Sequence, residues 1–122
     1  YSLMMQTPAQ GKNGKAIMPH SMRKDGTPSK GSIYLWTAGF FPGTLWYLSN
    51  YTGDKALQDS ALVYTHQMEP AKTFTDNHDI GFMMYCSYGN ANRFAPKDEY
   101  EDILVESSKS HSIMEWISQL AR

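Results

Sequence analysis

The chain has 122 residues, the length of one ordinary domain, and its formal net charge is −1 at neutral pH. Lysines and arginines are scattered along the sequence, which argues against binding to nucleic acid or to an anionic membrane surface. The single cysteine, Cys86, cannot form an internal disulfide, and its apolar neighbours are typical of a buried, unreactive thiol. No apolar run approaches the length needed to span a membrane.

The first part of the chain, residues 7–32, is rich in Gly, Lys, Pro and Ser and predicts an irregular loop with a turn at residues 24–26. No convincing strand pair is found. Apolar residues at helical spacing then predict four helices, over Phe40–Tyr51, Lys55–Glu69, Ile80 to about Asn92, and Asp98–Arg122. The third is apolar nearly all round, which indicates burial, although the run "YCSYGN" (85–90) within it has poor helix propensity. The fold class expected is all-α.

An internal repeat organises these helices. The segment "WTAGFF" (36–41) aligns with "HDIGFM" (78–83), and each copy is followed by an apolar helix, a turn and an outer amphipathic helix. Stacked helical hairpins of this kind build solenoids or closed α/α toroids. In a toroid the inner helices point the same way, so Trp36 and Asp79 would lie on one rim.

The number of repeats bears on the organisation of the chain. Two repeats, with a third broken at the N-terminus, cannot close a ring, and repeat units need neighbours to bury their faces. We therefore expect the chain to be a piece of a larger domain. We also expect self-association through the exposed repeat faces.

Asp79, which directly precedes the third helix, is the main candidate for chemistry. It is either a helix cap, whose carboxylate accepts a backbone N–H of the first turn, or a general acid or base at the rim of a pocket. A general acid must stay protonated near neutral pH, which requires burial or a nearby second carboxylate. The sequence offers no obvious second carboxylate.

Two further residues border this position. His78 is either a bystander in a loop or part of the same site, and Trp36 is either a core residue or part of a pocket. The four histidines are far apart and show no zinc-binding spacing, and no glycine-rich phosphate loop is present.

The motifs "WTAGFFPGTLWYLSNYTGD" (36–54) and "DNHDIGFMMYCSYGN" (76–90), in the correct spacing, resemble the unsaturated glucuronyl hydrolases of glycoside hydrolase family 88. The segment "IMPHSMRKDG" (17–26) is similar to the segment that precedes the tryptophan motif in that family. The resemblance implies an (α/α)6 toroid, of which residues 1–122 would form the N-terminal part, truncated after about two to three hairpins.

The resemblance also implies a reaction. Family members remove a 4,5-unsaturated uronic acid from the non-reducing end of oligosaccharides made by polysaccharide lyases, and need no metal or organic cofactor. An aspartic acid, matched here by Asp79, protonates C4 of the vinyl ether, and water adds at C5. Trp36 matches a tryptophan of the substrate pocket, and His78 borders the same site. The second catalytic aspartate would lie beyond Arg122, so the isolated chain is expected to be inactive.

Two other functions stay open from the sequence. One is an unsaturated rhamnogalacturonyl hydrolase, with the same toroid and chemistry but a different leaving sugar. The other is a helical-repeat interaction module without catalysis, which would have no need of the acid on its rim. The sequence names neither the glycan nor the compartment, which would be the cytoplasm or the periplasm of a bacterium.

Overall fold

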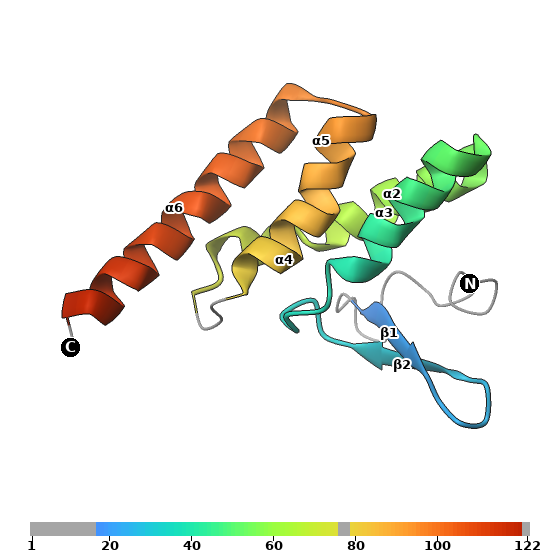
Figure 1. The fold of residues 1–122 in the computed structure, drawn as a ribbon, viewed down its shortest axis with the longest axis horizontal. Coiled ribbons are helices and arrows are strands. Elements are labelled where there is room, and N and C mark those ends of the chain that lie inside the picture. The colour runs from blue at the N-terminus through green and yellow to red at the C-terminus, as the bar shows by residue number, and fades with distance from the viewer. Residues whose placement is uncertain (1–16, 76–78, 121–122) are drawn as a thin grey trace.

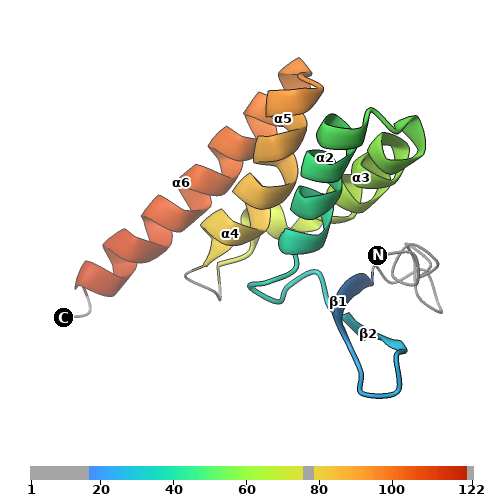
Figure 2. The ribbon, with the colours of Figure 1, turned by 45° about the vertical axis from the view of Figure 1, so that its right-hand side comes forward.

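The computed structural model describes residues 17–75 and 79–120, with the side chains of 111–118 left aside. Figures 1 and 2 show a layer of helices with a small β-hairpin beside the start of its first helix. The elements are β1 (Met18–Met22), β2 (Pro28–Gly31), α2 (Phe40–Thr52), α3 (Lys55–Gln67), α4 (Ile80–Met84), α5 (Asn90–Phe94) and α6 (Asp98–Leu120). A 3-10 turn over Glu69–Thr73 follows α3. The chain is mostly helical, as predicted, and no helix in the described ranges is long and apolar enough to cross a membrane.

The β-hairpin corrects the expectation that no strand pair would form. β1 and β2 pair antiparallel from Met18 opposite Gly31 to Met22 opposite Pro28. The turn between them is the predicted one, with Gly26 at φ 82°. These strands lack the alternation of apolar and β-branched residues by which strands are recognised in a sequence. Their pairing is held by contacts in the turn instead. The fully buried Met18 anchors the hairpin in the core.

The turn of the hairpin is built around Asp25. Its carboxylate accepts hydrogen bonds from the backbone N–H of Thr27 at 2.9 Å and from the Thr27 hydroxyl at 2.7 Å. These bonds favour the charged form and lower the pKa of Asp25 below its ordinary value. An Asx-type turn of this kind fixes the hairpin locally.

Helices α2 and α3 form the first helical hairpin. α2 ends at Gly53, which adopts the left-handed conformation at φ 70°, and Asp54 caps α3 by accepting the N–H of Ala56 at 2.9 Å. The two helices are tied together in the core, where the indole N–H of Trp46 donates to the hydroxyl of Thr65 at 2.9 Å and both side chains are buried. Helix α3 stops at Gln67, two residues before the predicted end.

The second inner helix is continuous but irregular. A π-helical segment over Tyr85–Gly89 joins α4 to α5, within the run whose helix propensity is poor. Side chains satisfy backbone carbonyls there: the hydroxyl of Ser87 donates to the carbonyl of Met83 at 2.7 Å, and the amide of Asn90 donates to the carbonyl of Cys86 at 2.8 Å. The run of poor helix formers therefore forms a wider π-helical turn and does not end the helix. The local side-chain hydrogen bonds keep the helix continuous there.

Two glycines, Gly39 at the N-cap of α2 and Gly43 within it, bring the backbone of α2 against α4 and the π-helical segment. A Cβ atom on Gly39 would collide with the carbonyl oxygens of Phe82 and Met83, and one on Gly43 would lie 2.7 Å from the carbonyl oxygen of Cys86. From Gly39 to Gly43 the contacted residues move from Phe82 and Met83 to Cys86, so the contacts advance in the same direction along both helices. The inner helices are therefore parallel and begin at the same end, as the repeat predicts (Figures 1 and 2).

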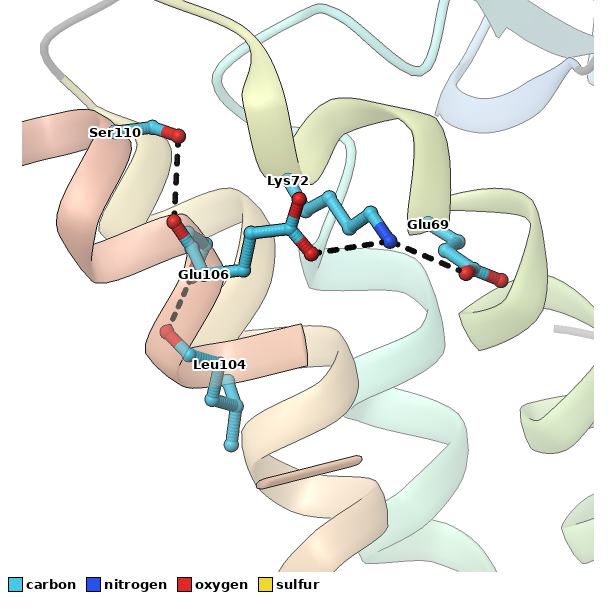
Figure 3. A network of polar contacts seen from close by, with 6 residues as sticks. Glu69, Lys72, Leu104, Glu106 and Ser110 are labelled. Atoms are coloured by element: carbon cyan, nitrogen blue, oxygen red, sulfur yellow. Dashed lines mark hydrogen bonds and ion pairs between the residues drawn. The ribbon is translucent and has the colours of Figure 1, made fainter. Parts of the chain in front are cut away.

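Helix α6 packs back on α4 and on the 3-10 turn. The hydroxyls of Tyr85 and Ser108 are hydrogen-bonded at 2.9 Å. Lys72 of the 3-10 turn lies between two carboxylates, 3.2 Å from that of Glu106 on α6 and 3.5 Å from that of Glu69 (Figure 3). The hydrogen bond and the charge of Glu106 raise the pKa of Lys72. These contacts close the second helical hairpin onto the first.

Candidate active site

Asp79 lies at the N-cap position of α4 and is half-buried. Its backbone carbonyl accepts the N–H groups of Phe82 at 2.9 Å and Met83 at 3.3 Å, so the residue is fixed to the first turn of the helix. Its side chain accepts no capping hydrogen bond from this turn, in contrast to Asp54 at the start of α3. Asp79 thus has the position of a cap without the side-chain bond that defines one.

Trp36 lies in the loop that leads into α2, and it is not a core residue. Its indole packs edge-on against the rings of Phe40 at 5.7 Å and Phe82 at 6.2 Å, and these two rings lie 6.1 Å apart. The three side chains, here called the rim aromatic cluster, are 48%, 40% and 51% exposed, respectively. They offer aromatic edges and faces to the surface.

The rim aromatic cluster brings the two repeats together. Phe82 follows Asp79 by one turn of helix, and its ring contacts Trp36 of the other repeat. Trp36 and Asp79 therefore lie at the same end of the helical layer, as predicted. His78, the other predicted residue, lies outside the described residues.

Phe40 and Phe82 are members of the cluster that sequence reasoning missed. They occupy equivalent positions in the two copies of the repeat, directly after Gly39 and Gly81. That equivalence was the available signal, because residues that follow the same helix start must lie at the same end of a toroid. The sequence pattern predicts an apolar helix around each of them and does not indicate which face each occupies.

The β-hairpin also reaches this end of the molecule. The imidazole Nδ1 of His20 in β1 is 3.0 Å from the hydroxyl oxygen of Thr37, the residue next to Trp36. The hydrogen bond holds the loop before α2 against the hairpin. The segment "IMPHSMRKDG" thus lies beside the tryptophan motif in space as well as in sequence.

The chemistry available at this end is acid–base chemistry beside an aromatic surface. Within residues 17–75, 79–110 and 119–120, no group of three or more His, Cys, Asp or Glu side chains could hold a metal ion. Cys86 is half-buried on the same inner helix, and burial raises the pKa of its thiol, which keeps the reactive thiolate scarce. Asp79 is the candidate proton donor that the sequence predicts at this end.

Curated proteins with similar sequences carry one name. The chain is 41% identical over 76 residues to the unsaturated glucuronyl hydrolase of Formosa agariphila, a match over 62% of this chain and 19% of that protein. It is 34% identical over 68 residues to the unsaturated glucuronyl hydrolase of Bacillus sp. strain GL1, over 52% of this chain and 18% of that protein. The matches span less than a fifth of these relatives. No family model matches the sequence.

Solved structures agree with the sequence relatives. An unsaturated glucuronyl hydrolase specific for heparin matches 90% of this chain and 28% of its own, with a TM-score of 0.77 and 37% sequence identity. A mutant of the enzyme from Streptococcus agalactiae, solved in complex with dGlcA-GalNAc6S, matches with a TM-score of 0.62 over 80% of this chain and 27% of its own. At 19% identity the latter shows the fold alone. Such structures are (α/α)6 barrels, and in sequence and in fold this chain is similar to one segment of the unsaturated glucuronyl hydrolases.

Proposed function

We propose that this chain is the N-terminal part of a single (α/α)6 catalytic domain, comprising about two to three of its hairpins. The enzyme would remove a 4,5-unsaturated uronic acid from the non-reducing end of lyase-generated oligosaccharides of the glycosaminoglycan type. The similarity to unsaturated glucuronyl hydrolases supports this proposal, at 41% identity in sequence and at 37% identity with a matching fold. The parallel inner helices support the toroid.

In this proposal the carboxyl group of Asp79 is the general acid. It transfers its proton to C4 of the vinyl ether, and a water molecule adds its oxygen at C5. The proton that the water releases regenerates the acid, so one water is added across the double bond. The hemiketal formed at C5 then opens, and the bond to the leaving sugar breaks to release the shortened oligosaccharide as an alcohol.

The rim aromatic cluster is the proposed binding surface for the sugar. The observation that carries this assignment is the ring contact of Trp36 with Phe82 at 6.2 Å, since it places the aromatic surface one helical turn from Asp79. Aromatic faces are large, rigid and apolar, and the C–H faces of a pyranose ring can pack on them. His78, which neighbours Asp79 in sequence, is proposed as a further substrate-binding residue.

The 122-residue chain alone is expected to show no turnover. By resemblance, the second catalytic aspartate belongs to a part of the enzyme beyond Arg122. In the reaction that the resemblance implies, a second carboxylate acts together with the one matched by Asp79. Activity is therefore a property of the longer protein.

The test is an ultraviolet assay of the longer protein on unsaturated disaccharides, because hydration of the vinyl ether abolishes its absorbance. Loss of absorbance with a glycosaminoglycan disaccharide is the expected result. Loss only with an unsaturated rhamnogalacturonan disaccharide would favour the related rhamnogalacturonyl hydrolase. If neither substrate is turned over, the proposed reaction is wrong, and an interaction module becomes the better account.

We also propose that the isolated chain self-associates through its uncovered repeat face. Gly81 occupies in the second repeat the place of Gly39 in the first. A Cβ atom on Gly39 would collide with the backbone of α4, whereas one on Gly81 would meet nothing within 4 Å. The face of α4 that carries Gly81 is therefore uncovered. It is equivalent to the face of α2 that packs on α4, so a second copy of the chain could pack on it in the same way.

A further inference from the structure

A second concave site lies on the outer side of the helical layer. It is a pocket of about 530 Å³ between α3, the 3-10 turn and α6, here called the outer pocket. Its lining residues include none of the rim aromatic cluster and not Asp79. The reaction proposed above makes no use of it.

The outer pocket carries an excess of negative charge. Four carboxylates and one ammonium group line it, and the ammonium group of Lys72 is already shared by Glu69 and Glu106 (Figure 3). Glu99 and Asp102, on the first turns of α6, have no ion-pair or hydrogen-bond partner among the described residues. Two carboxylates on one side of the pocket are thus available to a cation.

An independent observation points to a ligand in the same place. Tyr88 lines the outer pocket, its side chain is fully buried, and its hydroxyl makes no hydrogen bond within the described part of the chain. Buried polar groups of native proteins nearly always have a partner, so an orphaned hydroxyl calls for one. Its ring is fixed by Tyr100 at 5.5 Å and by His66 at 6.3 Å, which leaves the phenol little freedom to turn elsewhere.

The charge around Tyr88 decides which role its hydroxyl takes. Burial, together with the charges of Glu69 and Glu99, raises the pKa of Tyr88, so the phenol is neutral at physiological pH. A neutral phenol can accept a hydrogen bond from an N–H donor. An anionic ligand is excluded, because it would face the carboxylates of Glu99 and Asp102.

We propose that the outer pocket binds a guanidinium or primary ammonium group, with the carboxylates of Glu99 and Asp102 holding its charge and the Tyr88 hydroxyl accepting one of its hydrogen bonds. These cations combine a positive charge with several N–H donors, and charge-assisted bonds to carboxylates are the strong ones. The group belongs either to a free organic amine or to a basic side chain of a polypeptide.

The binding test uses the full-length protein and three probes: N-methylguanidinium, methylammonium and tetramethylammonium. Calorimetric titration should show saturable binding of the first two, weakened by added salt, and none of tetramethylammonium, which has no N–H donor. The substitution Asp102→Asn should weaken binding about tenfold, as expected for losing a hydrogen bond to a charged group. The matched control is Asp59→Asn, which removes the same charge from an exposed site on α3, where Asp59 is paired with Lys55 at 3.4 Å; binding should not change.

Tyr88→Phe tests the hydroxyl separately. The substitution keeps the ring and should lower affinity severalfold, while thermal unfolding of the free protein stays unchanged or moves to higher temperature, because an orphaned buried group is removed. An unchanged affinity in this variant would refute the role of Tyr88. Absence of saturable binding, equal binding of tetramethylammonium, or equal weakening by Asp102→Asn and Asp59→Asn would overturn the proposal as a whole.

The source of the cation is distinguished by a fourth probe, the capped peptide acetyl-Gly-Arg-Gly-amide. If it binds at least tenfold more tightly than N-methylguanidinium, the pocket serves a polypeptide side chain. Equal affinities identify a free organic cation as the ligand. Both results support the shared chemistry, and neither depends on glycosidase activity.

Discussion

Replacing Gly39 by alanine would place a methyl group where the backbone of α4 already lies. The new Cβ atom would collide with two carbonyl oxygens, those of Phe82 and Met83. A backbone neighbour cannot turn away as a flexible side chain can, so α2 and α4 must separate. Overpacking of this kind costs roughly 1–3 kcal/mol, and alanine is also a poorer N-cap than the glycine it replaces.

The matched control is Gly81→Ala, at the equivalent position of the second repeat. A Cβ atom there would meet nothing within 4 Å, and alanine is favoured over glycine in a helix by about 0.5–1 kcal/mol. In the 122-residue chain at low concentration, circular dichroism should show a midpoint lowered by roughly 3–15 °C for Gly39→Ala, and unchanged or raised for Gly81→Ala. Equal effects of the two substitutions would refute the close parallel packing of α2 on α4.

Four further outcomes are expected. In a longer protein where the next repeat covers α4, Gly81→Ala should become destabilising like Gly39→Ala, which thermal unfolding would show; an unchanged midpoint there would argue against a third stacked hairpin. Thr65→Val, which leaves the indole N–H of Trp46 buried without its acceptor, should lower the free energy of unfolding by about 1–3 kcal/mol in urea titrations. Trp36→Ala should raise KM of the full-length enzyme more than it lowers kcat, since the side chain is proposed to bind rather than react. Sedimentation of the isolated chain should reveal dimers or larger species at micromolar concentration, and a clean monomer would contradict an adhesive repeat face.

The repeat allowed most of the helical architecture to be predicted from the sequence. Pairing "WTAGFF" with "HDIGFM" implied parallel inner helices, and the collisions that a Cβ atom on Gly39 would make show why glycine stands at that place. The end of α2 at Gly53 was also readable, because a left-handed C-cap favours glycine. Helix periodicity and caps are local signals, so they can be recognised in the sequence without knowledge of tertiary contacts.

The hairpin and the π-helical segment could not be predicted in the same way. β1 and β2 carry Pro, Ser, Lys and Gly in place of the usual strand formers, and their pairing depends on the Asp25 turn and on the burial of Met18. The widened turn over Tyr85–Gly89 depends on bonds from Ser87 and Asn90 to carbonyls. These tertiary contacts and side-chain hydrogen bonds offset the poor strand and helix propensities, and they cannot be inferred from propensity alone.

The candidate site was only partly visible in the sequence. Asp79 and Trp36 stand out in the sequence because each precedes an inner helix of the repeat, and the structure brings both to one end. Phe40 and Phe82 did not, because a phenylalanine in an apolar helix is more often core than surface. The outer pocket was missed entirely, since Tyr88 and Asp102 meet there from different helices and share no local motif.

The central claim, that Asp79 is the proton donor of a vinyl-ether hydratase reaction, is tested most directly by Asp79→Asn in the full-length enzyme. Asparagine keeps the size of the side chain and suits an N-cap as well as aspartate does, but it has no acidic proton to transfer. The matched control is Asp54→Asn, at an aspartate that caps α3 through the N–H of Ala56. Both variants should fold alike, which isolates the chemistry.

The measurement is the rate at which ultraviolet absorbance of an unsaturated glycosaminoglycan disaccharide is lost. The account predicts a fall of about 10²–10⁴-fold in kcat for Asp79→Asn, with substrate binding largely intact, because that is what a general acid contributes. Asp54→Asn should turn over substrate at the wild-type rate. A wild-type rate in Asp79→Asn would contradict the account and leave Asp79 as a residue that only begins a helix.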